Sequence, residues 1–123
     1  MIQRLHSLLF YASDLKKTAE FYRGAGFDVK ETDDGVRIKM GDFTLAFIDE
    51  RKTPIQNESG KTPKGLGIYI YVQVDDADAH YKFVKESGII PRTEPRTWEW
   101  GKREFVVKDP DGYKIVFYSP VKK

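Results

Sequence analysis

The chain has 123 residues, of which 40% are hydrophobic and 33% are charged, as is typical of one soluble globular domain. Its formal net charge of +2, with acids and bases interleaved, is too small to indicate nucleic-acid binding, and the lack of cysteine excludes disulfides, thiol nucleophiles and Cys-based zinc sites. No apolar run reaches the ~20 residues of a membrane span and no signal-peptide pattern is present, so we expect a cytoplasmic protein without a membrane partner.

The first half carries the patterns of four strands and one helix. Ser13 or Asp14 can cap the helix, because a short side-chain oxygen accepts hydrogen bonds from the free N–H groups of the first turn. Gly24 or Gly26 is expected to end it by adopting a positive φ. The predicted elements are a strand over 2–12, the helix, a strand over 27–32, and a hairpin with strands over 36–40 and 43–48.

A polar segment with prolines and glycines, residues 51–65, is interpreted as a linker or mobile loop. After it the same order of elements recurs. The predicted elements are a strand over 66–74, a helix capped by Asp75 or Asp76 and closed by Gly88, a short strand from Ile89-Ile90, a loop over 94–101, and a hairpin with strands over 103–108 and 113–118. The turn of that hairpin is predicted at Asp109-Pro110-Asp111-Gly112.

The two halves also match in sequence at a fixed spacing. Three residues recur at an offset of 62 (76−14 = 83−21 = 88−26), pairing Asp14 with Asp76, Phe21 with Phe83 and Gly26 with Gly88. Chance is the alternative, but the shared element order favours an internal repeat. We therefore predict an α+β fold in one domain, residues 1–123, with two tandem βαβββ modules over about 1–50 and 66–123. Their curved mixed sheets are expected to surround a cavity.

Strand alternation assigns the side chains of each sheet to a helix-packed face or a cavity face. The predicted cavity residues of the first sheet are Ser7, Leu9, Tyr11, Arg37 and Ala46. Those of the second are Tyr69, Tyr71, Val116 and Tyr118, with Arg103 and Phe105 opposite them in the last hairpin. Trp98 and Trp100 lie on a loop that could cover a ligand.

Two stretches identify a family resemblance. The helix start from Ser13 to Tyr22, followed by Gly26-Phe27, resembles the opening of the vicinal oxygen chelate superfamily. That group includes glyoxalase I, bleomycin-resistance proteins, fosfomycin-resistance enzymes and extradiol dioxygenases. Residues 100–105 and 109–115 are similar to its closing hairpin. The resemblance implies paired βαβββ modules and, in many relatives, a dimer, but it does not specify the chemistry.

The resemblance also implies four metal-ligand positions, usually filled by histidine or glutamate. Here they hold Ser7, Tyr69, Ala46 and Val116. Alanine and valine offer no donor, and two hydroxyls are a poor set for a divalent ion. We therefore expect no metal and no cofactor. A bulge that turns His6 inward is the alternative, although it would leave two of the four positions without a donor.

The emptied site is aromatic and partly basic, which favours a metal-free protein that sequesters an aromatic or amphiphilic small molecule, as a homodimer. Arg37, Lys39 and Arg103 favour an anionic or phenolic ligand, whereas bleomycin-resistance proteins trap a cationic drug. The alternatives are a solvated charged face, rings that only fill the interior, and tryptophans that serve a dimer interface.

Two further functions remain open. One is a glyoxalase- or dioxygenase-like enzyme with atypical metal ligands or with metal-free acid–base chemistry. Tyr69, Tyr71 and Glu104 are its first candidates, although alternation is expected to point Glu104 out of the cavity. The other is a regulatory or structural dimer with a filled interior.

Overall fold

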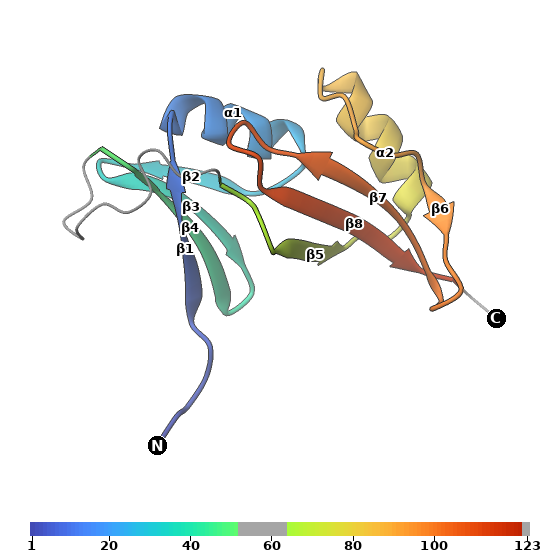
Figure 1. Ribbon diagram of the computed structural model, residues 1–123, viewed down its shortest axis with the longest axis horizontal. Coiled ribbons are helices and arrows are strands. Elements are labelled where there is room, and N and C mark those ends of the chain that lie inside the picture. Colours follow the sequence, from blue (N-terminus) through green and yellow to red (C-terminus); the bar gives the residue numbers. More distant parts are fainter. Residues whose placement is uncertain (52–63, 122–123) are drawn as a thin grey trace.

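The structure, a computed structural model, describes residues 1–51 and 64–121. It contains two four-stranded mixed sheets, each accompanied by one helix (Figure 1). The first sheet has the order β1-β4-β3-β2, formed by β1 (Ser7–Ala12), β4 (Phe43–Asp49), β3 (Gly35–Met40) and β2 (Val29–Thr32). The second has the order β5-β8-β7-β6, formed by β5 (Tyr69–Gln73), β8 (Lys114–Pro120), β7 (Lys102–Lys108) and β6 (Arg96–Thr97). The pairs β1–β4 and β5–β8 are parallel, and all other neighbouring strands are antiparallel.

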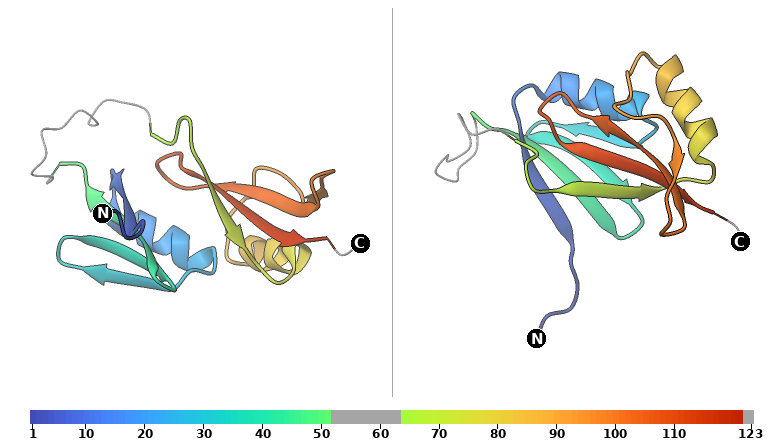
Figure 2. Two further views of the ribbon diagram at one scale, coloured as in Figure 1. Left: turned by 90° about the horizontal axis from the view of Figure 1, so that it is seen from below. Right: turned by 45° about the vertical axis from the view of Figure 1, so that its right-hand side comes forward.

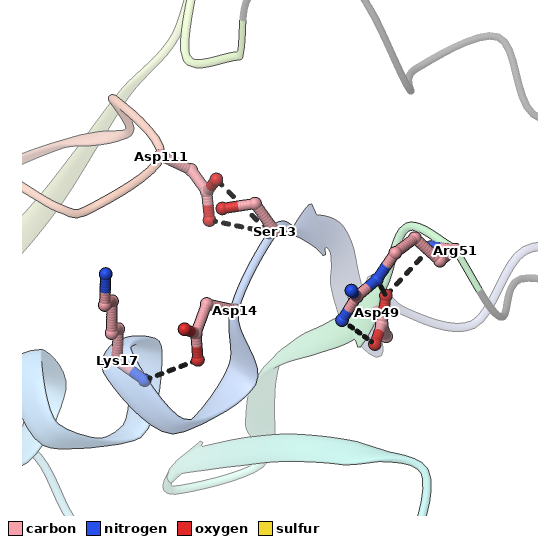
Figure 3. A network of polar contacts seen from close by, with 6 residues as sticks. All are labelled: Ser13, Asp14, Lys17, Asp49, Arg51 and Asp111. Atoms are coloured by element: carbon pink, nitrogen blue, oxygen red, sulfur yellow. Dashed lines mark hydrogen bonds and ion pairs between the residues drawn. The ribbon is translucent and has the colours of Figure 1, made fainter.

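The two helices begin and end as their capping residues predict. Asp14 caps α1 (Leu15–Gly24) by accepting a hydrogen bond from the Lys17 N–H at 3.1 Å, as Figure 3 shows. Asp76 caps α2 (Ala77–Glu86) through the Ala79 N–H at the same distance. Gly26 and Gly88 follow the last turns with φ of 102° and 98°, a backbone conformation that favours glycine.

The internal repeat is visible in the element boundaries. The starts of the two helices differ by 77 − 15 = 62 residues, and those of β1 and β5 by 69 − 7 = 62. The last strands, β4 and β8, start 114 − 43 = 71 residues apart, so the second module has a longer stretch between helix and last strand. The predicted tandem βαβββ fold is confirmed, but the two sheets do not close around a cavity.

One aromatic core joins the modules. Phe10 of β1 stacks on Phe47 at 5.2 Å between ring centroids and meets Tyr113 of the second module edge-on at 4.9 Å. Phe27 and Phe117 also meet across the modules, at 5.6 Å. The helix-packed faces of both sheets contribute side chains to this one core. Burial of these apolar side chains therefore holds the two modules together as well as stabilising each of them.

The loop between β7 and β8 ties the modules together with polar contacts. The Asp111 carboxylate accepts the Ser13 N–H at 3.1 and 3.2 Å, which brings that loop to the start of α1 (Figure 3). The Tyr113 hydroxyl donates to the Tyr11 carbonyl at 3.0 Å. The buried Tyr22 hydroxyl donates to Asp109 Oδ2 at 2.8 Å.

Some predicted boundaries were wrong. The short strand expected from Ile89 does not form: the Ile89 N–H bonds the Val84 carbonyl as part of the helix end, and the edge strand is the two-residue β6. Nearby Pro91 and Pro95 have no N–H for a sheet ladder. The first and fifth strands start later than predicted, at Ser7 and Tyr69. Most of the predicted 51–65 linker lies outside the described residues.

Candidate functional site

The candidate site is the face of each sheet that is turned away from its helix, called here the open face. Figure 2 shows the two sheets next to each other, each with its own helix. On β1, Phe10 and Ala12 are buried while Leu9 between them is 53% exposed. On β5, Ile70 and Val72 pack against the core while Tyr69 and Tyr71 are 59% and 50% exposed. The predicted face assignment of these two strands is therefore correct.

The open face of the first sheet is a small-residue floor edged by basic side chains. Leu9 lies opposite Ala46 across the β1–β4 pair, and Arg37 lies opposite Ala46 across the β3–β4 pair. Ala46 itself is only 5% exposed. A groove of about 610 Å³ runs over this sheet. It is lined by Asp28, Val29, Lys30, Thr32, Arg37, Lys39 and Thr44.

The open face of the second sheet is aromatic. The rings of Tyr71 and Tyr118 lie 6.0 Å apart, and the Tyr118 hydroxyl donates to the Gln73 side chain at 3.2 Å. Lys102 Nζ lies over both rings, 4.6 Å from that of Tyr118 and 5.2 Å from that of Tyr71. Val116, directly beside Tyr71 in the register, forms a buried floor.

A stack of planar groups stands at the β6 edge of this face. The Arg96 guanidinium carbon lies 3.8 Å from the ring centre of Trp98. Trp98 stacks on Trp100 at 4.7 Å with only 7° between the planes. Trp98 shares a groove of about 630 Å³ with Glu104 and Val106. Trp100, 54% exposed, leaves much of its indole uncovered.

Two predicted cavity residues lie on the opposite, helix-packed face. Phe105 is fully buried in the core opposite Phe117 in the β7–β8 register. Arg103 donates two hydrogen bonds to the Asp78 carboxylate of α2, at 2.7 and 2.9 Å. Their assignment to the cavity was wrong, because directly opposed residues of an antiparallel pair share a face.

The error comes from the length of the β7–β8 loop. The predicted four-residue turn sets residue 108 opposite 113, whereas the structure pairs Lys108 with Lys114. Tyr113 belongs to the loop, because Asp109 Oδ1 accepts its N–H at 2.9 Å and the Asp109 N–H donates to its carbonyl. One extra loop residue exchanges the two faces of β7.

The same shift places Glu104 on the open face, where sequence reasoning did not expect it. Glu104 pairs with Tyr118 and is 8% exposed. Burial, followed by the negative charge of Glu104, raises the pKa of Tyr71. Glu104 Oε2 has no hydrogen-bond partner among the described residues. Glu104 could have been assigned to the open face only if the loop had been predicted with five residues in place of four.

The four ligand positions that the resemblance implies lie on the open faces. Ala46 sits beside Leu9 and Val116 beside Tyr71, equivalent places in the two sheets (71 − 9 = 62). Their two hydroxyls and two hydrocarbon side chains do not fit a divalent ion. Across residues 1–51 and 64–121, no group of three or more His, Asp or Glu side chains could hold one. His6 is exposed and contacts Ser7 Oγ through Nδ1 at 3.1 Å. The metal-free state stays a prediction.

Comparison with known proteins places this geometry in a family. The chain matches the Glyoxalase/Bleomycin resistance protein/Dioxygenase superfamily over residues 4–117. Bleomycin resistance proteins of Geobacillus stearothermophilus and Staphylococcus aureus are 26% identical over 120 residues, covering 89% of this chain and 91% of theirs.

Solved structures give the same result for the fold. A hypothetical protein of S. aureus superposes with a TM-score of 0.79 at 26% identity, over 97% of this chain and 95% of that one. A glyoxalase/bleomycin resistance protein/dioxygenase from Nocardioides superposes at 0.78 with 19% identity, over 99% and 87%. Among the described residues no helix is long and apolar enough to cross a membrane. The chain belongs to the glyoxalase/bleomycin resistance protein/dioxygenase superfamily.

Proposed function

We propose that this chain is a metal-free binding protein that holds an aromatic or amphiphilic small molecule against the open face of its second sheet. The observation that carries the proposal is the placement of its exposed rings. Of the four exposed aromatic residues in the described part of the chain, Tyr69 and Tyr71 lie on that face, Trp100 stands at its edge, and Phe83 lies on α2. Aromatic side chains left in water beside grooves are typical of ligand sites.

The exposed rings supply enough surface for useful affinity. A tyrosine or tryptophan buries roughly 150–250 Å², so covering the exposed half of Tyr71 or Trp100 removes on the order of 100 Å² from water. At about 25 cal/mol per Å² each ring contributes at most ~2.5 kcal/mol. The free energies of several such contacts add, and the cost of immobilising the ligand reduces the sum. We therefore expect a dissociation constant in the micromolar range.

A second copy of the chain is proposed to complete the site. Because the two sheets do not close on each other, each open face has no cover from the described residues. Leu9, Tyr69 and Tyr71, each at least 50% exposed, form apolar surface of the kind that dimers bury. A sedimentation or light-scattering mass of twice 14.2 kDa is expected. A monomer at micromolar concentration would argue against this part of the proposal.

Binding is tested on protein purified without added metal. Planar compounds, bleomycin among them, are screened by thermal shift and tryptophan quenching. Tyr71→Ala should weaken any ligand found by about tenfold or more, whereas Phe83→Ala is a matched control, because Phe83 has similar exposure, 48% against 50%, but lies on α2. The proposal fails if no compound shifts stability while the protein turns over a glyoxalase-type substrate.

Glu104 gives a specific reason to keep an enzyme as the second candidate. It is a buried carboxylate on the open face, and burial together with the negative charge of Glu104 raises the pKa of Tyr71 on the same face. Such a pair can exchange a proton with a bound substrate by general acid–base chemistry. Turnover lost in both Glu104→Gln and Tyr71→Phe would favour this candidate. Stoichiometric Ni, Zn, Fe or Mn in the purified protein would favour a metal-dependent enzyme instead.

A further inference from the structure

Positive charge is concentrated on the open faces. Among strand residues that alternation and register place on these faces, seven are basic and one is acidic. The basic residues are Lys30, Arg37, Lys39, Arg96, Lys102, Lys108 and Lys114, and the acid is Glu104. The whole chain is nearly balanced, with 21 basic and 19 acidic residues, so this is a local excess.

The helix-packed faces of the same strands are different. Their charged residues are Glu31, Asp49 and Arg103. Each of these is in an ion pair: Glu31 with Arg23 at 3.0 Å, Asp49 with Arg51 at 3.0 Å and Arg103 with Asp78 at 2.7 Å. None of the seven open-face cations forms an ion pair with a described carboxylate. Their charge is therefore available to a ligand.

Three of these cations lie directly on the aromatic surface where a planar ligand would bind. Lys102 Nζ sits over Tyr71 and Tyr118, Lys114 Nζ lies 5.4 Å from the ring of Tyr69, and Arg96 covers Trp98. A cation over a ring gains only ~0.5–1 kcal/mol at an exposed site and keeps its full charge. Lysine side chains are flexible, so their ammonium groups can turn to a ligand that takes their place on the rings.

The carboxylates of the second sheet's open face do not cancel that charge, although Glu94 of the preceding loop lines the same groove as Glu104 and Trp98. Glu104 is buried and lies opposite Tyr118 in the β7–β8 register, and its negative charge contributes to the raised pKa of Tyr71. On the second sheet two acids, the buried Glu104 and the loop residue Glu94, are set against four basic side chains, Arg96, Lys102, Lys108 and Lys114. A cationic ligand stacked on Tyr71 would therefore lie within a few ångströms of Lys102 and be repelled.

We infer that the ligand of this protein is a planar aromatic anion, such as an aryl carboxylate, sulfonate or phosphate. The inference rests on the proposed function and adds the charge of the ligand. The ring stacks on the tyrosine and tryptophan surface, and the anionic group meets the ammonium groups of Lys102 and Lys114. The name of the relatives, bleomycin resistance protein, points to small molecules, but a cationic drug is opposed by this charge pattern.

The test uses three naphthalenes of one ring size and different charge: naphthalene-2-sulfonate, 2-naphthylmethanol and 2-naphthylmethylammonium. Binding to the full chain is measured by calorimetry in 50 mM and 300 mM NaCl. The sulfonate is expected to bind at least tenfold more tightly than the ammonium compound, with the alcohol between them. The difference should shrink in 300 mM salt, because the higher ionic strength screens exposed charges.

Variants show whether the preference is local. Lys102→Met should weaken sulfonate binding by about fivefold, the effect of one unit charge at roughly 4 Å in water, and leave alcohol binding nearly unchanged. Lys102→Arg should retain the preference. Lys82→Met, which removes the same charge from exposed α2, should leave all three affinities unchanged. Thermal melts of each variant confirm that it is folded.

The outcomes separate the two proposals. Equal binding of all three naphthalenes, or tighter binding of the ammonium compound, would overturn the inferred ligand charge and leave aromatic binding in place. A preference that Lys102→Met and Lys82→Met reduce equally would overturn the local assignment. If none of the three compounds binds, the result would count against the proposed function itself and remove the inference with it.

Discussion

Replacing Tyr22 with phenylalanine is expected to destabilise the junction between the modules. Tyr22 is fully buried on α1, and its hydroxyl donates to Asp109 Oδ2 at 2.8 Å. The other carboxylate oxygen already accepts the N–H groups of Asp111 and Tyr113, at 2.9 Å each. Tyr22→Phe therefore leaves Oδ2 without this donor inside the protein. A hydrogen bond to a charged group is worth about 1.5–3 kcal/mol, so we expect a loss of about 2 kcal/mol at pH 7.

The loss should depend on pH in a defined direction. Burial raises the pKa of Asp109 above its ordinary 3.8, while the Tyr22 hydroxyl opposes that rise. A raised pKa in the folded state means that this group's contribution to stability is full below pH 3.8 and is lost as the pH rises through the folded pKa. Without the Tyr22 donor the folded pKa rises further, which deepens the loss at pH 7. At pH 4 a larger share of this carboxyl group is neutral than at pH 7, so the destabilisation should be smaller.

The assay is urea unfolding followed by tryptophan fluorescence at pH 7 and pH 4, with the midpoint and slope fitted to two states. The expected loss corresponds to a Tm lowered by roughly 6–10 °C for a chain of this size. Tyr118→Phe is the control, because its hydroxyl makes an exposed 3.2 Å bond to Gln73, and it should cost less than about 0.5 kcal/mol. Equal midpoints for Tyr22→Phe and the unmodified chain at pH 7, or the same loss at both pH values, would refute the reasoning.

Three further predictions concern the core, the loop contacts and the single helix histidine. Phe105→Ala should lower the free energy of unfolding by about 3–5 kcal/mol in a urea titration; little loss of stability but lost ligand binding would return Phe105 to the site. Gly65→Ala should destabilise by much more than Gly41→Ala, because both have positive φ but only the Gly65 Cβ collides with the Gly112 carbonyl; similar Tm values would contradict this. NMR should give a pKa below 6.5 for His80, because burial lowers the pKa more than the hydrogen bond from the ring to the Ala25 carbonyl raises it. The contribution of His80 to stability is then present above pH 6.5 and is lost as the pH falls through the folded pKa. A measured pKa above 6.5 would contradict this.

Local chemistry made much of the fold predictable from the sequence. Asp14 and Asp76 cap the two helices, and Gly26 and Gly88 take positive φ after them, because each choice depends only on neighbouring backbone groups. Alternation on β1 and β5 also gave the correct faces, because both strands keep a regular two-residue period. The repeat offset of 62 residues relates the first strand and the helix of the two modules.

The part of the site that could not be predicted depends on contacts between distant residues. The faces of β7 follow from Tyr113, whose backbone is bonded to Asp109 in the loop while its ring packs on Phe10 in the other module. The Asp-Pro-Asp-Gly sequence fits a four-residue turn and no pattern signals the ring contact with Phe10, so Phe105 was assigned to the wrong face and Glu104 was missed. Arg37 and Lys39 were predicted on the cavity face, whereas Lys102 and Lys108 are assigned to the open face only after β7 and β8 are paired in register.

Chemical-shift mapping with naphthalene-2-sulfonate tests most directly whether the open face of the second sheet is the binding surface. We expect the largest changes at Tyr71, Tyr118 and Trp100, in step with one binding curve, and small changes at the exposed Phe83 on α2. Shifts centred on Phe83 and the helices, with Tyr71 and Trp100 unchanged, would contradict the proposed site.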